Sequence, residues 1–254
     1  MLVKKRYAKR PSMVKLSVNI NKIATLRNAR GETNPNVLKA ALDIESYGAD
    51  GITVHPRPDG RHIRFSDVFD LKKNIKVELN IEGYPSHEYI KLVSEIKPAQ
   101  ATLVPDPPEA LTSDAGWNVK KNEAFLSAAV QKLKPSGARI SLFIDPLNVS
   151  TQELAIIKSL GIERIELYTK LYADVFHSKK LQETLEFYKK VAREAEKVGL
   201  GVNAGHDLDL KNLGYLVRNI PELLEVSIGH ALICDALNFG LKDTVQKYLL
   251  AAKG

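Results

Sequence analysis

Short apolar runs alternate along this chain with longer segments of helical periodicity. Eight runs have the length of a strand: 15–21, 51–56, 76–83, 100–106, 139–145, 164–170, 201–207 and 223–230. Between them, apolar residues recur at the three- and four-residue spacing of amphipathic helices, most clearly in 35–48, 86–98, 150–161 and 179–199. The alternation of eight strands with eight helical regions predicts parallel strands joined by helical crossovers.

The length of 254 residues suits a single α/β domain of this kind. We therefore predict a single-domain (β/α)8 TIM barrel over residues 15–254, preceded by a short basic arm, residues 1–14. An open doubly wound sheet is the alternative. It usually carries a glycine-rich phosphate loop after its first strand, and neither GxGxxG nor GxxxxGK[ST] occurs in the sequence.

Side chains alternate across each strand, so every barrel strand offers one set to the lumen and one to the helices. If the aliphatic sets face the helices, the lumen is unusually polar. The inward set is then Asn19 and Asn21; Thr53, His55 and Arg57; Glu78, Asn80 and Glu82; Ser141, Phe143 and Asp145; Glu166, Tyr168 and Lys170. Buried polar groups need partners. We expect those near the barrel floor to satisfy one another and those at the carboxyl ends of the strands to bind a ligand.

The formal net charge of +7 belongs mostly to the N-terminal arm. Residues 1–15 hold six basic residues and no acid, which leaves 31 basic against 30 acidic residues in the rest of the chain. The near-neutral body lacks basic residues interleaved with aromatics, which disfavours nucleic acid as a partner.

Two further absences in the sequence bear on the compartment. No apolar stretch reaches the length of a membrane span, and the basic arm lacks the apolar core of a signal peptide. The single cysteine, Cys234, cannot form an intrachain disulfide. We expect a cytoplasmic protein with no membrane partner.

Four of the six histidines fall at or just beyond predicted strand ends: His55, His62, His206 and His230. Arginines accompany them at 30, 57 and 61, and glycines precede His206 and His230. Arginine forks match phosphate oxygens, and barrels commonly hold phosphate in the loops after strands 7 and 8. This pattern predicts a phosphorylated small-molecule ligand.

For proton transfer, Glu82 and His55 end neighbouring strands, and His206 could supply an acid from the opposite side of the mouth. Strict alternation from Asn203 points His206 away from the lumen, so His206 reaches the site only if strand 7 ends before it. A zinc or iron site on these three residues is a rival, disfavoured by the nearby arginines and Lys22. For Lys170, a structural salt bridge or a pairing with Glu166 is favoured over a role as a Schiff-base lysine.

Seven segments, from about residue 15 to the C-terminus, resemble the pyridoxine 5'-phosphate synthase family. They are NINKIATLRNARG (19–31), DGITVHPRPDGRHI (50–63), LNIEG (79–83), LVPDPPEALTSDAGW (103–117), SLFID (141–145), VNAGHDL (202–208) and IGHALI (228–233). The resemblance implies a homo-octamer of (β/α)8 barrels. It also implies condensation of 1-deoxy-D-xylulose 5-phosphate with 3-amino-2-oxopropyl phosphate to pyridoxine 5'-phosphate, phosphate and water, without metal or organic cofactor.

Carried over by position, the resemblance implies that His55 and Glu82 are general bases and His206 a proton donor. The implied substrate-binding residues are Asn19, Arg30, Arg57, His62, Thr112, Gly229 and His230. Asn21 and Lys22 stand where the family pattern has Asp-His, and Asp207 stands where it has glycine. We keep these three as substrate-site positions.

Two other functions stay open from the residues. One is a phosphosugar isomerase, epimerase or aldolase on the same fold, because fold alone does not fix chemistry. The other is a binding protein that holds phosphorylated ligands without turnover.

Overall fold

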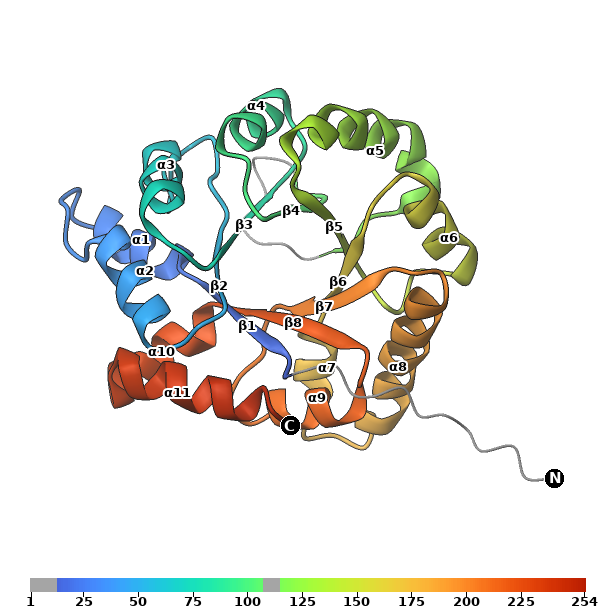
Figure 1. The fold of residues 1–254 in the computed structure, drawn as a ribbon. Coiled ribbons are helices and arrows are strands. Elements are labelled where there is room, and N and C mark those ends of the chain that lie inside the picture. The colour runs from blue at the N-terminus through green and yellow to red at the C-terminus, as the bar shows by residue number, and fades with distance from the viewer. Residues whose placement is uncertain (1–12, 107–114) are drawn as a thin grey trace.

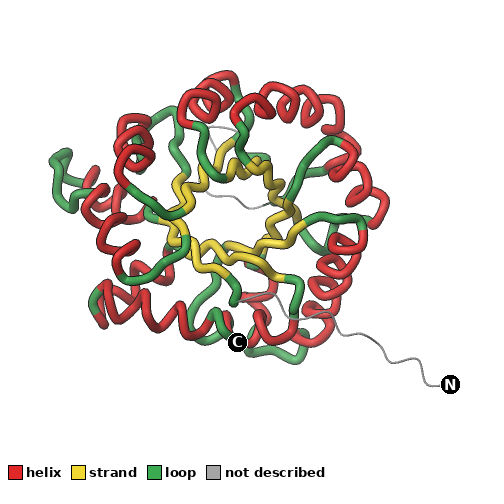
Figure 2. Tube along the Cα trace, in the orientation of Figure 1, coloured by secondary structure: helices red, strands yellow, loops and turns green. Residues whose placement is uncertain are grey.

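Eight parallel strands close into a barrel in sequence order, each paired with the next and β8 with β1. The structure is a computed structural model that describes residues 13–106 and 115–254. Figures 1 and 2 show the ring of strands surrounded by helices. The strands are β1 (Lys15–Asn19), β2 (Gly51–Val54), β3 (Glu78–Gly83), β4 (Gln100–Leu103), β5 (Arg139–Ile144), β6 (Arg164–Tyr168), β7 (Gly201–Gly205) and β8 (Leu223–Ile228). The (β/α)8 barrel prediction is confirmed.

The helices of the described ranges form the outer layer. They are α1 (Asn21–Asn28), α2 (Val37–Ser46), α3 (Phe65–Asn74), α4 (His87–Ile96), α5 (Val119–Leu133), α6 (Thr151–Ser159), α7 (Lys170–Val175), α8 (Leu181–Lys197), α9 (Leu213–Asn219), α10 (His230–Phe239) and α11 (Leu241–Ala251), with a 3-10 turn η1 (Lys134–Ser136).

All eight predicted strands are present, most of them shorter at their carboxyl ends than the apolar runs. Serine side chains cap two of these helices: Ser86 accepts a hydrogen bond from the Tyr89 N–H, and Ser150 forms a capping box with Glu153. Three helices start immediately after a strand, at residues 21, 170 and 230. The sequence pattern did not separate these short helices from the strands before them, because they continue the same run of residues.

The aliphatic residues of the strands face the helices as predicted and form the main core. Val18 and Ile52 are fully buried neighbours on β1 and β2, and the same phase continues around the barrel. Removing such side chains from water stabilises the fold by about 25 cal/mol per Å² of apolar surface. This packing leaves the other phase of every strand to the lumen.

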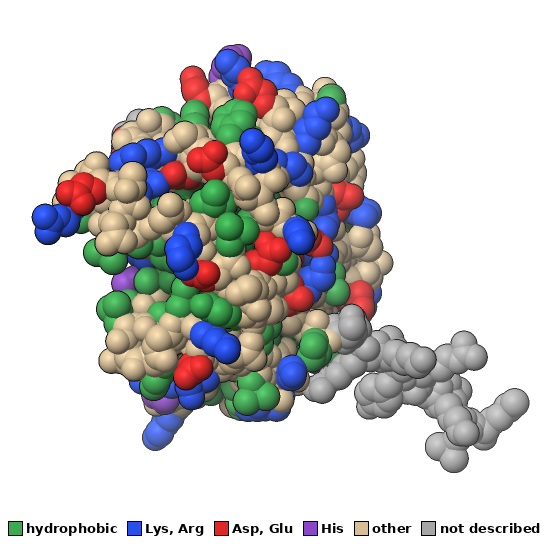
Figure 3. Space-filling model, turned by 60° about the vertical axis from the view of Figure 1, so that its left-hand side comes forward, with side chains coloured by type: hydrophobic (Ala, Val, Ile, Leu, Met, Phe, Trp, Pro, Cys, Tyr) green, Lys and Arg blue, Asp and Glu red, His purple; other side chains and the backbone are tan. Residues whose placement is uncertain are grey.

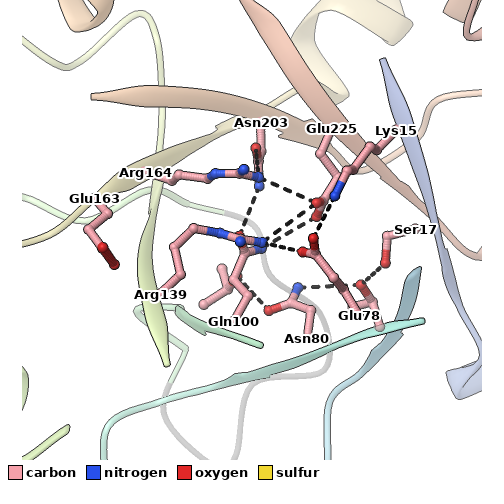
Figure 4. Close-up of polar contacts among 12 residues, drawn as sticks. Lys15, Ser17, Glu78, Asn80, Gln100, Arg139, Glu163, Arg164, Asn203 and Glu225 are labelled. Carbon is pink, nitrogen blue, oxygen red and sulfur yellow. Dashed lines mark hydrogen bonds and ion pairs between the residues drawn. The ribbon is translucent and has the colours of Figure 1, made fainter. Parts of the chain in front are cut away.

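At the floor of the lumen, charged side chains pair with one another (Figure 4). Glu78 accepts hydrogen bonds from Lys15 and Arg139, each at 2.5 Å. Glu225 lies 3.4 Å from the Arg164 guanidinium and 3.9 Å from that of Arg139. Every charge in this layer has an opposite partner, as buried charges require.

The layer above the floor is built from small polar groups. Thr53 Oγ1 bonds Ser17 Oγ at 2.7 Å and accepts from Asn80 at 3.3 Å, and Thr102 donates to Asn80 Oδ1 at 3.0 Å. The expectation of a self-satisfied floor holds for Glu78 and Asn80. It is wrong for Ser141, whose buried hydroxyl has no hydrogen-bond partner in the described structure.

Among the described residues, no helix is both long and apolar enough to cross a membrane.

Candidate active site at the mouth of the barrel

The mouth of the barrel has two unlike sides. On β1 to β3, polar groups converge: Asn19 donates to Glu82 Oε2 at 3.4 Å, and His55 Nδ1 lies 3.9 Å from the same oxygen. On β5, β6 and the end of β4, Val104, Phe143 and Tyr168 form a separate apolar cluster inside the lumen. A ligand in the mouth would therefore meet acid–base groups on one side and an apolar wall on the other.

Glu82, at the end of β3, has a strongly raised pKa. Burial raises its pKa and the nearby Asp106 carboxylate raises it further, whereas Arg57 and a hydrogen bond with Ser227 oppose the change, leaving a pKa of about 8. Its side chain is only 13 % exposed. Glu82 can therefore exchange a proton near neutral pH, as a catalytic acid or base requires.

The two histidines of this side are both held neutral. Burial, with the charges of Arg57, His62 and Arg61, places the pKa of His55 well below its usual value. Burial, with Arg57, Arg61 and Lys22, lowers the pKa of His62 to about 4. The rings meet edge-on at 6.2 Å. The His55–Glu82 contact is thus one between a neutral imidazole and a largely protonated carboxyl, rather than an ion pair.

Arg57 is buried in the wall of the mouth and pairs with Asp106 at 3.3 Å. Arg61 lies on the rim with Asp59, at 2.6 Å. Arg30 is exposed beyond the end of α1. The structure therefore gives the three predicted arginines three different environments, and only Arg57 lines the buried part of the site.

Arg27 was not predicted from the sequence as a site residue. It is 5 % exposed, donates to the His62 carbonyl and forms a two-pronged contact with Asp67. It shares the buried face of α1 with Ile23 and Ala24, so helical spacing could have identified it. Arg27 fixes the loop that carries His62.

Asn21 and Lys22 open α1 directly after β1. Asn21 Oδ1 accepts the His55 backbone N–H at 2.9 Å, and Asn19 Oδ1 accepts the Asn21 N–H at 3.0 Å. Asn21 thus ties the start of α1 to the end of β2 through its carbonyl oxygen, a contact that asparagine and aspartate can both make. Lys22 is exposed and close enough to His62 to influence its pKa.

Strand β7 ends at Gly205, directly before His206, as the placement of His206 in the site required. The His206 ring lies edge-on to Tyr168 at 5.1 Å and 6.4 Å from Phe143, both of which face the lumen. His206 Nδ1 is 2.7 Å from Asp207 Oδ2. His206 therefore reaches the mouth from the side opposite His55.

A second buried carboxyl, Glu166, lies below His206 and was not predicted as a site residue. Burial, with Glu82 and Glu225, raises its pKa well above the usual value. A Cβ at Gly205 would fall 2.3 Å from Glu166 Oε1, so a larger residue at position 205 would displace this carboxyl. The inward phase of Glu166 on β6 could have identified it from the sequence as a lumen residue. Its proximity to Glu82 is seen only in the tertiary structure.

Gly229 and His230 form the start of α10 beside β1. A Cβ at Gly229 would lie 3.0 Å from the Asn19 Cβ, so glycine allows this helix to approach the mouth closely. The free backbone N–H groups of a helix start attract anions. Thr112, the remaining predicted substrate residue, lies outside the described residues.

Lys170 opens α7 at the end of β6. It pairs with Asp174 at 2.8 Å and is exposed, so the salt bridge is formed with α7 rather than with Glu166. No cluster of three potential metal ligands was found among His, Cys, Asp and Glu residues in the described ranges.

Comparison with known proteins adds a family to this geometry. Residues 16–253 match the family model described as pyridoxal phosphate biosynthesis protein PdxJ. A pyridoxine 5'-phosphate synthase of Cytophaga hutchinsonii is 55 % identical over 95 % of this chain and 100 % of its own length. One of Bacteroides fragilis is 53 % identical over 93 % of this chain and 98 % of its own.

Solved structures with low sequence identity share the fold. A tryptophan synthase α-subunit of Pyrococcus furiosus superposes with a TM-score of 0.63 at 14 % identity, covering 93 % of this chain and 97 % of that one. A phosphoribosylanthranilate isomerase of Thermotoga maritima gives 0.58 at 12 %, covering 95 % and 100 %. These likenesses concern the barrel alone.

Proposed function

This chain belongs to the PdxJ family of pyridoxal phosphate biosynthesis proteins, and on that premise we propose that it is a pyridoxine 5'-phosphate synthase. In this reaction 1-deoxy-D-xylulose 5-phosphate condenses with 3-amino-2-oxopropyl phosphate to give pyridoxine 5'-phosphate, inorganic phosphate and water. The observation that carries the proposal is near full-length identity above 50 % to synthases, together with a titratable Glu82 facing His55 in the barrel mouth.

We assign proton transfer to groups on opposite sides of the mouth. His55 is neutral and able to accept a proton, and Glu82, with a pKa of about 8, can give or take one near neutral pH. His206 supplies a proton from the side of β7. The amine of the substrate forms the imine itself, so the reaction needs no lysine nucleophile, metal or organic cofactor.

Glu166 adds a second carboxyl to this set. It lies close enough to Glu82 for the Glu82 carboxylate to raise its pKa, so the two side chains do not both ionise easily. We propose that a proton shared by these carboxyls stays available during ring closure and dehydration, steps that require repeated proton transfer.

We place the substrate phosphates at two basic regions. The start of α10, with Gly229 and His230, offers backbone N–H groups near β1. Arg57, His62 and Lys22 offer positive or hydrogen-bonding groups on the β2 side, with Asn19 and Asn21 between the two regions. Arg30, exposed beyond the end of α1, and Thr112, which lies outside the described residues, complete the set by resemblance.

We propose that the protein assembles as a homo-octamer in the cytoplasm and that residues 1–14, of which 1–12 lie outside the described residues, form a basic arm. Exposed apolar side chains support assembly: Leu237 is 82 % and Leu250 68 % exposed, on α10 and α11. Leu26 of α1, a helix that packs against α10, is 60 % exposed. Figure 3, which brings this side of the molecule forward, shows several groups of hydrophobic side chains among the charged ones. Light scattering coupled to gel filtration measures the assembly directly.

The test of function is turnover. The purified protein, incubated with both phosphorylated substrates, is expected to form the pyridine chromophore and release one phosphate per ring formed. A well-folded preparation that binds the substrates without forming product would support a binding protein instead. Isomerised or cleaved sugar phosphate with no ring would support a phosphosugar enzyme.

A further inference from the structure

The turn after β7 holds two consecutive non-glycine residues in the left-handed region. His206 has φ of +86° and Asp207 of +57°. This conformation is uncommon outside glycine, although His, Asn and Asp adopt it more readily than other residues. The surroundings fix both carbonyls: Thr169 Oγ1 donates to the His206 oxygen at 2.5 Å, and Asn212 Nδ2 donates to the Asp207 oxygen at 3.2 Å. The backbone therefore holds the two side chains in one arrangement.

In that arrangement the side chains meet, with His206 Nδ1 2.7 Å from Asp207 Oδ2. The hydrogen bond with His206 lowers the pKa of Asp207 against the effect of its partial burial, and Lys170 and His230 lower it further. An ionised carboxylate only accepts hydrogen bonds, so Nδ1 must carry the proton. Tyr168 packs edge-on against the ring. Nε2 is then the nitrogen left to face a substrate.

We propose that Asp207 is a positioning residue that holds His206 as the Nδ1–H form and so presents Nε2 for proton transfer. From the sequence, Asp207 was predicted as a substrate-site position. A carboxylate aimed at a bound phosphate would repel it, whereas the Asp207 carboxylate is turned to the imidazole of His206 and can accept a hydrogen bond there. In this chain, Asp207 therefore forms a His–Asp pair with His206. The kinetic consequence rests on the proposed synthase function, but the pairing itself does not.

The first experiment needs no turnover. Nitrogen-15 NMR of histidine-labelled protein reports which ring nitrogen of His206 is protonated, with His206→Gln identifying the resonances. The expected wild-type signal is a protonated Nδ1. In Asp207→Gly, which accepts the left-handed backbone without strain, the Nε2–H form should become the major neutral form. Asp174→Asn removes one nearby exposed charge that does not touch His206 and should leave the wild-type signal unchanged.

The second experiment separates positioning from substrate contact. Asp207→Gly should lower kcat by about tenfold or more, because His206 loses the partner that fixes its tautomer, with KM for each substrate within about twofold. Asp207→Asn keeps an oxygen acceptor and should recover part of kcat. A ten-fold change in KM at constant kcat would instead make Asp207 a direct substrate ligand.

An unchanged His206 tautomer in Asp207→Gly overturns the proposal whatever the kinetics show. If the wild-type protein makes no pyridine product, the proposed synthase function fails, while the NMR result still decides whether Asp207 positions His206.

Discussion

Glu78 and Glu82 lie on the same strand, in the same inward phase, four residues apart, yet their carboxyls behave in opposite ways. Burial alone would raise the pKa of Glu78, but hydrogen bonds from Arg139 and Lys15 outweigh it and lower the pKa to about 2. At Glu82, burial and Asp106 outweigh Arg57, and the pKa rises to about 8. The floor of the lumen pairs its charges, whereas in the mouth burial raises the pKa values of both Glu82 and Glu166, at Glu82 against the effect of Arg57.

This contrast separates structure from chemistry within one polar lumen. A charge with a fixed opposite partner stays in one protonation state over the working pH range, so it stabilises the barrel and moves no proton. A carboxyl without such a partner costs stability but responds to a substrate. The layer in which a polar residue lies is therefore more informative than its residue type.

Glu82→Gln should have the largest effect. The amide keeps the size and the contact with Asn19 but can neither donate nor accept a proton in catalysis, so turnover should fall about a thousandfold or more. The measurement is formation of the pyridine product under saturating substrates, with calorimetry to show that 1-deoxy-D-xylulose 5-phosphate still binds. Glu95→Gln, an exposed change on α4, is the matched control and should be fully active. Full activity of Glu82→Gln would remove Glu82 from the mechanism.

Glu78→Gln should weaken the fold and spare the chemistry. It removes the charge that Lys15 and Arg139 share, and we expect a loss of about 1–3 kcal/mol of unfolding free energy at pH 7, measured by urea denaturation. Because the pKa of Glu78 is lowered in the folded state, its contribution is present above about pH 4.5 and is lost as the pH falls toward 2. The difference between variant and wild type should narrow accordingly in acid. A variant as stable as wild type at pH 7 would mean that the floor pairs contribute no net stability.

Glu82 should also make stability depend on pH, with the sign opposite to that of Glu78. The folded state favours the protonated carboxyl up to a pKa of about 8, whereas the unfolded chain loses this proton near pH 4.3. The free energy of unfolding therefore falls progressively as the pH rises from about 4.5 to 8. Glu82→Gln lacks this penalty, so its Tm advantage over wild type should grow by several degrees between pH 5 and pH 8 in calorimetric scans. A difference in Tm that stays constant over this range would contradict the raised pKa.

Ser141→Ala should have the smallest effect. The buried hydroxyl has no hydrogen-bond partner in the described structure, so its removal should change the unfolding free energy by less than about 0.5 kcal/mol or increase it slightly. Thr102→Val, which loses a donor to Asn80, is the comparison and should cost about 1 kcal/mol. Equal losses in the two variants would indicate that Ser141 has a partner after all.

The local pattern of the sequence determined the barrel. Period-two alternation along the strands, helical spacing between them, and serine caps at 86 and 150 all depend on residues close together in the chain. The same alternation placed His55 and Glu82 in the lumen, and it showed that His206 could reach the site only where strand β7 ended. The short helices that begin at strand ends were not predicted as separate elements, because their few residues show no helical periodicity of their own.

Only the tertiary structure decided which partners each polar side chain has and in which direction its pKa is shifted. Glu78 and Glu82 are indistinguishable by local pattern, and what separates them is supplied by other elements: Lys15 from β1 and Arg139 from β5 at the floor, and Asp106 after β4 at the mouth. The Glu82–Glu166 pair likewise joins β3 to β6 across the barrel. A pKa depends on burial and on charges a few ångströms away, and barrel closure brings those charges together from distant positions: Lys15 and Arg139, 124 residues apart, both bond Glu78.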